Sequence, residues 1–230
     1  MQGLLLIDKP ADWTSFDAVN YVRRIVAGVE DKKPKNVKVG HSGTLDPFAT
    51  GLLLLFIGKN YTRKAQEFTK LDKTYELTME LGSVSTTGDT EGEIVKQSDN
   101  VPSIDEIKEV LNKYRGEIDQ KPPIYSAIKV NGQRAYKLAR EGKIPDLEPR
   151  KVSINTLEIL KYDYPKLDLV TNVSSGTYIR SLVEDIGKDL NTGAYTSVLR
   201  RTSIGTFKLD KAVTPKSLTS ENLNDLVFEI

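Results

Sequence analysis

The chain has 230 residues, of which 38% are hydrophobic, and this is enough apolar sequence for one large domain or two small ones. It contains no cysteine and one histidine, so disulfides, cysteine nucleophiles and conventional zinc sites are excluded, and only all-carboxylate metal sites stay open. No run of about 18 apolar residues occurs, and the N-terminus lacks the features of a signal peptide, which predicts a cytoplasmic protein.

The formal net charge of +1 hides an uneven distribution of charges. The segment from Arg23 to Lys38 has six basic and two acidic residues, and the segment from Lys121 to Lys151 has eight basic and three acidic residues. The tail from Asp210 to Ile230 has four acidic and two basic residues. The two basic segments fit either a solvated lysine-rich face or a surface that binds RNA.

The first third of the chain predicts two strands and two helices. Gly3 to Ile7 forms a short buried strand, and Ser15 is the expected N-cap of a helix that ends at Gly28. After a glycine-rich loop, the apolar run from Leu52 to Gly58 has the length of a buried strand. A polar helix is expected from Tyr61 to Thr69.

The middle of the chain predicts a half-buried strand and a capped helix. Apolar and polar residues alternate in KTYELTMELG, which places Tyr75 near the start of a strand. Ser103 and Glu106 have the spacing of a capping box, and apolar residues then recur at helical spacing until Gly116.

The last part of the chain predicts more strands than helices. The segment IYSAIKVNGQ is read as a strand that ends in a tight turn at Asn131 and Gly132, before a basic helix from Ala135 to Arg140. The segments SINTLEIL, KLDLVTNV and YTSVLRRTSIGTFKL are further strand candidates. Between them, GTYIRSLVEDIGKDL is an amphipathic helix, and a short acidic helix closes the chain.

Helices and strands alternate irregularly, without a repeated βαβ unit or an internal repeat. This favours an α+β fold with a mixed, mainly antiparallel sheet flanked by helices and loops. No linker rich in proline, glycine or serine interrupts the sequence, so residues 1–230 are expected to form one domain with loop insertions.

The loop GHSGTLDPFATG contains the only histidine, His41, together with Asp46 and three glycines. Pro47 restricts Asp46 to an extended backbone, and the glycines permit close backbone approach, so this loop holds a carboxylate in a fixed place. An ordinary Asp-Pro surface turn explains the same residues.

Two other chemistries do not fit this loop. Ser42 and Asp46 are both near His41 in sequence, but members of a Ser/His/Asp triad come from separate elements, and GHSG lacks the G-x-S-x-G elbow. A P-loop and a dinucleotide fingerprint are also missing, so the sequence indicates no nucleotide cofactor.

The loop GHSGTLDPFATGLL closely resembles the signature of the TruB family of tRNA pseudouridine synthases. Further segments resemble the family in the same order: LLLIDKPADWTS, KTYELTMELG, TTGDTEG, KPPIYSAIKVNGQRAYKLAREG, SSGTYIRSLVEDIG and VLRRTSIGTF. The resemblance covers almost the whole chain. It implies the pseudouridine synthase fold and an enzyme, without a cofactor or a metal, that isomerises uridine-55 in the T loop of tRNA.

The resemblance assigns the essential catalytic carboxylate to Asp46 and a paired arginine to Arg180. A carboxylate suits the reaction because it can attack the ribose or stabilise positive charge that develops there, and then help to remove a proton. Arg180 falls in the first turn of a predicted helix, where a cation meets the unfavourable end of the helix dipole. A carboxylate partner would compensate for this, and the pairing would keep Asp46 ionised.

The reaction requires the uridine to leave its stack, and the resemblance implies the other site residues. The resemblance places His41 and Tyr75 against the RNA by stacking, and Tyr178 and Leu199 in the wall of the uracil pocket. Asp89 corresponds to an aspartate in a substrate-facing loop. Without the resemblance, Tyr75 would be an ordinary sheet aromatic and Tyr178 and Leu199 ordinary core residues.

Phosphate contacts are expected from basic side chains, which position RNA without reading its sequence. The candidates are Lys9 and the basic residues between Lys129 and Arg140.

The chain departs from the family pattern in two places. Ser85, Thr86 and Thr87 stand where an aspartate between two threonines is common. Family members usually continue into a small RNA-binding PUA domain, yet this sequence stops soon after GTFKLDKAVTP, so weaker or more salt-sensitive RNA binding is expected.

Three functions are compatible with the resemblance. The leading hypothesis is a monomeric tRNA pseudouridine-55 synthase that binds the T arm. The second is the guide-RNA-dependent branch of the family, which shares the GHSGTLDP motif and works in a multiprotein particle. The third is an RNA chaperone that refolds tRNA and performs no essential catalysis, against which the presence of Asp46, Tyr75 and Arg180 together argues.

Overall fold

The computed structural model describes residues 1–126, 128–130, 132–143 and 145–230. The chain divides into two compact units: unit 1 comprises Met1–Glu76 and Leu199–Ile230, and unit 2 comprises Leu77–Val198. Strands β4 (Lys73–Leu81) and β12 (Ala194–Ile204) each have residues in both units. The single domain expected from the sequence stays a prediction.

Unit 1 is built on two long apolar strands. Strand β1 (Gly3–Lys9) is antiparallel to β3 (Thr50–Ile57), and the short strand β2 (Val39–His41) also pairs with β3 in antiparallel fashion. The last part of β12 runs parallel to the start of β3, with Arg200 opposite Thr50 and Arg201 opposite Gly51. The hairpin partner of β12 is β13 (Phe207–Lys208).

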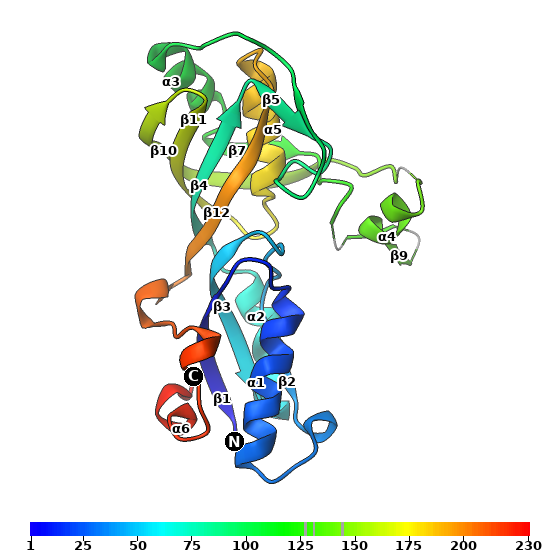
Figure 1. The fold of residues 1–230 in the computed structure, drawn as a ribbon, viewed down its shortest axis with the longest axis vertical. Helices are drawn as coiled ribbons and strands as arrows, with labels where there is room; N and C mark the ends of the chain where they lie inside the picture. The colour runs from blue at the N-terminus through cyan, green and yellow to red at the C-terminus, as the bar shows by residue number, and fades with distance from the viewer. Residues whose placement is uncertain (127, 131, 144) are drawn as a thin grey trace. The chain divides into compact units, whose positions relative to one another are not determined.

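The continuous apolar sequence of β1 and β3 is explained by burial on both faces of these strands. One face packs against helix α1 (Ser15–Val29) through Leu5, Ile7, Leu53, Leu55 and Ile57. The other face carries Leu4, Leu6, Leu52, Leu54 and Phe56, against which helix α2 (Lys59–Thr69) packs through Tyr61, Ala65 and Phe68. Figure 1 shows α1 and α2 alongside these strands.

The N-cap of helix α1 lies one residue before the predicted N-cap, Ser15. Thr14 is the N-cap and forms a reciprocal capping box with Asp17, so Ser15 is the first helical residue and its hydroxyl serves elsewhere. The helix also continues past Gly28 to Val29, because glycine lowers helix propensity without breaking the backbone hydrogen bonds.

Unit 2 contains a sheet in which β4 is followed by β11 (Lys166–Val173), β10 (Arg150–Asp163) and β7 (Gly116–Gln120), and β12 lies on the other side of β4. The pairs β10–β11 and β10–β7 are antiparallel. Helix α3 (Ile104–Lys113) begins at the predicted capping box of Ser103 and Glu106, and α5 (Ile179–Asp189) is the predicted amphipathic helix.

The remaining elements are short. In unit 2 they are β5 (Ser83–Ser85), β6 (Ile94–Lys96), β8 (Lys129–Val130), β9 (Gln133–Arg134) and α4 (Ala135–Arg140). In unit 1 they are η1 (Pro34–Asn36), η2 (Leu209–Lys211), η3 (Pro215–Ser217) and α6 (Leu223–Leu226). The strand predicted to end before Asn131 and Gly132 is present as the two-residue strand β8, which pairs with β9 in antiparallel fashion; Asn131 of the predicted turn lies outside the described residues.

Helices and a mixed, mainly antiparallel sheet confirm the predicted α+β class. Among the described residues, no helix is both long and apolar enough to cross a membrane. Within the same part of the chain, no three His, Cys, Asp or Glu side chains are grouped so that they could hold a metal ion.

Candidate active site

Asp46 lies in unit 1, in the loop that connects β2 to β3. The backbone of this loop is tied to β3, because the Ser42 amide donates to the Leu54 carbonyl at 3.3 Å, and it forms a turn of its own, in which the Ala49 amide donates to the Asp46 carbonyl at 3.2 Å. Gly43 has a φ of +92°, which favours glycine. Asp46 is half-buried, so the loop presents a carboxylate on a backbone fixed by its own turn.

Two buried polar side chains hold the loop from the α1 side of unit 1. The Ser15 hydroxyl donates to the Leu45 carbonyl at 3.1 Å and accepts from the Leu45 amide at 2.8 Å, directly before Asp46. The Lys9 ammonium donates to the carbonyls of Pro10 (2.9 Å), Trp13 (2.6 Å) and Pro47 (3.2 Å). These contacts fix the residues on both sides of Asp46.

Lys9 therefore has a different place from the predicted phosphate contact. Its side chain is 0% exposed, and its three hydrogen bonds use all three N–H groups of the ammonium. Burial lowers the pKa of Lys9 to about 8, although the nearby Asp46 carboxylate opposes this shift. At neutral pH the protonated lysine thus positions the Asp46 loop and brings a positive charge close to its carboxylate.

Arg201 also holds the loop, and the sequence analysis did not predict this residue. It is 1% exposed, and its guanidinium donates from Nε to the Leu52 carbonyl (2.8 Å) and from Nη2 to the Gly43 carbonyl (3.2 Å). The only signal in the sequence is an arginine at an inward position of the alternating strand β12. Buried arginines require polar partners, and here backbone carbonyls of the loop and of β3 supply them.

His41 ends strand β2, opposite Leu55 of β3. Burial is the main cause that lowers the pKa of His41, the positive charge of Arg201 adds to it, and a backbone contact with Gly43 opposes it. The imidazole is therefore neutral at pH 7. A neutral ring suits a stacking role better than the role of a general acid.

Tyr75 and Leu199 are the two remaining predicted site residues of unit 1. Tyr75 is on an inward position of β4 and is 7% exposed, and Leu199 on β12 is 6% exposed. Both side chains are thus buried in this structure, and their contact with a flipped base stays a prediction.

Arg180 lies in the first turn of α5 in unit 2 and is 5% exposed. Its guanidinium donates to the carbonyls of Thr87 (2.7 Å) and Tyr125 (3.0 Å) and is 3.3 Å from the Asp89 carboxylate. The Asp89 carboxylate thus compensates the cation at the N-terminal end of the helix, whereas the sequence analysis expected Asp46 in this role. The predicted pairing with Asp46 of unit 1 stays a prediction.

Asp89 is buried, with 2% exposure, and not directed to solvent as a substrate-facing turn residue would be. Besides Arg180, its carboxylate accepts from the Thr87 hydroxyl (2.5 Å) and from the Glu91 amide (2.9 Å). These bonds orient the Arg180 guanidinium, so the structure gives Asp89 a positioning role in unit 2.

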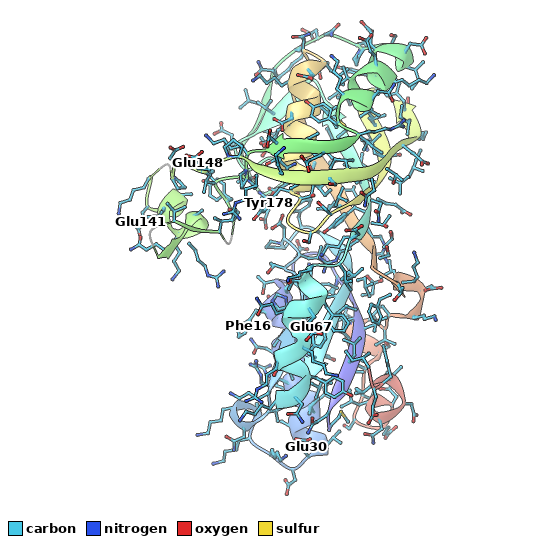
Figure 2. All side chains as sticks on the ribbon, turned by 180° about the vertical axis from the view of Figure 1, so that it is seen from behind. Phe16, Glu30, Glu67, Glu141, Glu148 and Tyr178 are labelled. Carbon is cyan, nitrogen blue, oxygen red and sulfur yellow. The ribbon has the colours of Figure 1, made fainter. Side chains whose placement is uncertain are left out.

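Tyr178 is the N-cap residue of α5 and is half-buried (Figure 2). The Gln120 side chain bridges its backbone, because its oxygen accepts from the Tyr178 amide (2.8 Å) and its NH₂ group donates to the Tyr178 carbonyl (3.0 Å). Gln120 is 2% exposed and was not predicted; a glutamine at the end of a polar strand carries no sequence signal for this role.

The predicted phosphate contacts between Lys129 and Arg140 are only partly described. Arg134 and Lys137 are exposed at β9 and α4, which leaves them accessible to RNA. The side chains of Lys129 and Arg140 lie outside the described part of the structure.

The fold is that of the pseudouridine synthases, as comparison with solved structures shows. A chain in the crystal structure of a Cbf5–Nop10–Gar1 complex is 30% identical, with a TM-score of 0.67 over 92% of this chain and 52% of that chain. A chain in an H/ACA RNP bound to a substrate RNA containing 2'-deoxyuridine is 27% identical, with a TM-score of 0.66 over 94% and 52%. This chain spans about half the length of both.

The family follows from the sequence comparisons. Residues 31–179 match the TruB family pseudouridylate synthase N-terminal domain, and residues 180–226 match the tRNA pseudouridylate synthase B C-terminal domain. The tRNA pseudouridine synthase B of Protochlamydia amoebophila is 42% identical over 93% of this chain and 78% of the relative. That of Aquifex aeolicus is 42% identical over 100% and 78%. The chain belongs to the TruB family of pseudouridylate synthases, which confirms the resemblance found in the sequence.

Proposed function

We propose that this chain is a tRNA pseudouridine synthase that converts uridine-55 of the T loop into pseudouridine, with Asp46 as the essential carboxylate. The observation that carries the proposal is the GHSGTLDP loop, whose backbone is held around Asp46 by hydrogen bonds from Lys9, Ser15 and Arg201. The names of the relatives support tRNA as the substrate.

The reaction breaks the bond between N1 of uracil and C1' of ribose and forms a bond between C5 and C1'. N1 gains a proton and C5 loses one, so the product is an isomer of the substrate. Asp46 can form a bond to the ribose or stabilise positive charge on it when the base detaches, and a carboxylate can afterwards accept the C5 proton. A rigid loop favours this chemistry because the carboxylate needs no reorganisation during the reaction.

The other residues prepare the substrate in this proposal. Extrusion of the uridine costs a few kcal/mol of lost stacking. His41 and Tyr75 offset this cost by stacking, and Tyr178 and Leu199 form apolar walls around the uracil. The pairing of Arg180 with Asp46 stays a prediction, while Asp89 orients the Arg180 guanidinium in unit 2.

The proposal includes a monomer that acts in the cytoplasm on the T arm of free tRNA. The guide-RNA-dependent alternative is favoured less, because the H/ACA chains are 27–30% identical to this chain and the tRNA pseudouridine synthase B relatives are 42% identical. A chaperone function without chemistry would leave the fixed carboxylate of Asp46 without a purpose. Activity on free tRNA without a guide RNA would exclude both alternatives.

The test is tritium release from a T-arm tRNA transcript that carries 5-tritiated uridine. The chain should release tritium, and Asp46→Asn should reduce the rate at least about a thousandfold while tRNA binding changes less than about threefold, since the amide keeps the shape but cannot supply the charge. The matched control is Asp12→Asn. It removes the exposed carboxylate of a residue whose backbone amide donates to the Pro47 carbonyl. Turnover by Asp46→Asn near that of the control would overturn the proposal.

A further inference from the structure

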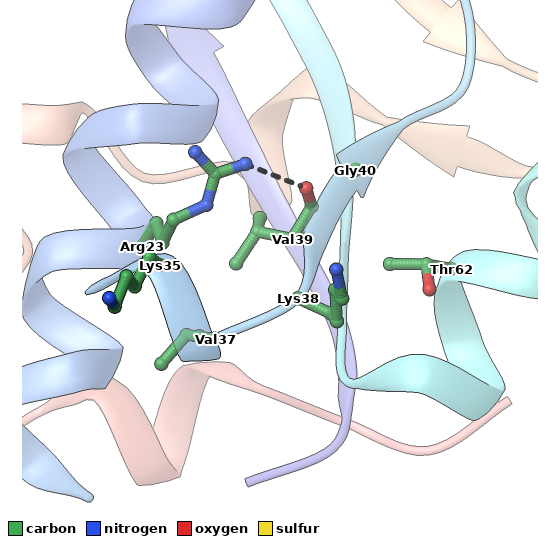
Figure 3. A pocket seen from close by; sticks show the side chains of 7 residues that line it. All are labelled: Arg23, Lys35, Val37, Lys38, Val39, Gly40 and Thr62. Carbon is green, nitrogen blue, oxygen red and sulfur yellow. Dashed lines mark hydrogen bonds between the residues drawn. The ribbon is translucent and has the colours of Figure 1, made fainter. Parts of the chain in front are cut away.

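A cavity of about 380 Å³ lies in unit 1 between α1, η1, β2 and α2 (Figure 3). Its charged lining residues are all cations: Arg23 from α1, Lys35 from η1 and Lys38 next to β2. Val37 and Val39 are buried and form apolar wall, and Thr62 of α2 lies across from Gly40. The volume is in the range of ligand sites, and the lining selects for an anion.

Arg23 is fixed in this cavity by neutral groups. Its guanidinium donates to the Asn20 side-chain oxygen at 2.6 Å and to the Val39 carbonyl at 3.3 Å, the bond drawn in Figure 3. The same guanidinium lies 5.6 Å from the centre of the Phe16 ring, which is 58% exposed and lies on the outside of the ribbon in Figure 2. These contacts orient the arginine but leave its charge uncompensated.

The surroundings do not neutralise the three cations. Among the described residues, no carboxylate forms an ion pair with Arg23, Lys35 or Lys38. Glu30 in the same segment is bonded to the N-terminal ammonium and to Lys32. An oriented arginine with two exposed lysines around one cavity is the arrangement that recognises a phosphate group.

The position of the cavity indicates which phosphate this is. Gly40 lines the cavity and is followed directly by His41, which ends β2 and leads into the Asp46 loop. A group in the cavity is therefore bound by the same short strand that delivers the proposed stacking residue. If His41 stacks against the RNA as proposed, a cationic cavity lined by the residue before His41 can bind the backbone of the same RNA.

We infer that this cavity is a phosphate-binding site for the backbone of the bound tRNA, formed by Arg23, Lys35 and Lys38. The inference rests on the proposed function in that the RNA is the substrate of the Asp46 site. It assigns a specific task to the basic segment from Arg23 to Lys38: the cavity fixes the backbone of the RNA beside the Asp46 loop, without reading its sequence.

The test compares two double variants in an Asp46→Asn background, in which turnover is blocked. Lys35→Gln with Lys38→Gln removes two cations from the cavity, and the control, Lys32→Gln with Lys33→Gln, removes two from the same segment outside it. The cavity variant should raise the dissociation constant for tRNA about tenfold at 0.1 M salt. It should also reduce the slope of log K against log salt concentration by about 1 to 2, because each lost phosphate contact removes about 0.9 from that slope. The control should change the dissociation constant less than about twofold.

Equal weakening by both double variants would show a diffuse field and overturn the inference, as would no weakening by either. Titration of the chain with inorganic phosphate distinguishes a second source of the ligand. If phosphate binds the cavity and tRNA affinity is the same in all variants, the site serves a free phosphate compound and the RNA assignment is wrong. Melting temperatures of the variants exclude unfolding as the cause.

The outcome is separate from that of the proposed function. With Asp46 intact, the cavity variant should keep its rate of tritium release at saturating tRNA while its KM rises. No release by the unmodified chain would contradict the function, whereas release with an unchanged KM in the cavity variant would contradict only the cavity assignment.

Discussion

The ion pair between Arg180 and Asp89 illustrates how single residues build unit 2. Both side chains are at most 5% exposed, and each has further hydrogen bonds that satisfy its polar atoms. A buried ion pair contributes little more to the stability of the fold than a well-packed apolar pair does. Removal of one partner, however, leaves a buried charge without compensation.

We therefore expect Arg180→Met to lower the free energy of unfolding by about 3–5 kcal/mol. Combination with Asp89→Asn should recover part of this loss, with a coupling energy of about 1–3 kcal/mol in a double-mutant cycle measured by urea unfolding. The control is Lys151→Met, which breaks the exposed pair of Lys151 with Glu117 and should cost less than about 1 kcal/mol. Additive effects of the Arg180 and Asp89 changes would contradict the coupling.

Lys73 is a second residue whose burial has a measurable consequence. It is 7% exposed at the start of β4, its ammonium donates to the carbonyls of Thr69 and Leu71, and burial, with the charge of Arg201, lowers its pKa to about 8. Between pH 8 and 10.5 the unfolded chain holds the proton and the folded chain does not. The contribution of Lys73 to the free energy of unfolding must then rise with pH between pH 8 and 10.5 and stay constant below pH 8.

The stability difference between the unmodified chain and Lys73→Met should therefore grow in favour of the unmodified chain by about 1 kcal/mol per pH unit from pH 8 to 10.5. Urea unfolding at several pH values measures this difference. The same substitution at the exposed Lys70 controls for loss of a lysine side chain. A difference for Lys73 that stays constant over this range would show that the lysine remains protonated in the folded state.

At the scale of elements, the Asp46 loop depends on the parallel contact between β3 and β12. Gly51 has a φ of +104°, and a Cβ atom there would lie 2.3 Å from the Arg201 carbonyl oxygen and 2.7 Å from its nitrogen. Only glycine lets the two backbones approach this closely, and the approach places the Arg201 guanidinium beside Gly43.

Gly51→Ala should consequently lower the free energy of unfolding by at least about 2 kcal/mol and reduce turnover with it, because β12 must move away from the loop. Gly28→Ala is the matched control: nothing lies within 4 Å of a Cβ atom at this position of α1. There alanine should stabilise the chain by about 0.5–1 kcal/mol through helix propensity. Thermal and urea unfolding of both variants measure the contrast, and a tolerated alanine at position 51 would disprove the close approach.

At the scale of the whole molecule, a net charge of +1 conceals basic surfaces on both units. Unit 1 carries the cavity of Arg23, Lys35 and Lys38, and unit 2 carries exposed basic side chains such as Arg134 and Lys137. Binding of a polyanion depends on such local charges and on the counterions that it releases, and not on the net charge.

Binding of tRNA by the Asp46→Asn chain should therefore be strongly salt-dependent. Three phosphate contacts, at about 0.9 each, would weaken the affinity about sixfold when the salt concentration doubles. Filter binding between about 0.1 and 0.4 M salt measures the slope. A dissociation constant that hardly changes over this range would show that phosphate contacts do not carry the binding.

The sequence by itself determined the periodic and motif-based features: the apolar strands β1 and β3, the capping box of α3, the amphipathic helix α5, the α+β class and the family. These features depend on neighbouring residues in the chain, whose spacing can be read directly. The resemblance of the GHSGTLDP loop to the family signature also points to Asp46, whose catalytic role stays a prediction.

Only the tertiary structure decided what surrounds that loop. Ser15 has the sequence pattern of a helix cap but bonds to Leu45. Lys9 has the pattern of a surface lysine but is buried and donates to the Pro47 carbonyl, and Arg201 carries no motif. Ser15, Lys9 and Arg201 bond to backbone groups of this loop that are about 30 to 160 residues away in the sequence. Every residue type has the same backbone carbonyl. A backbone carbonyl leaves no trace in the sequence of its partner, so these contacts appear only when the chain is folded.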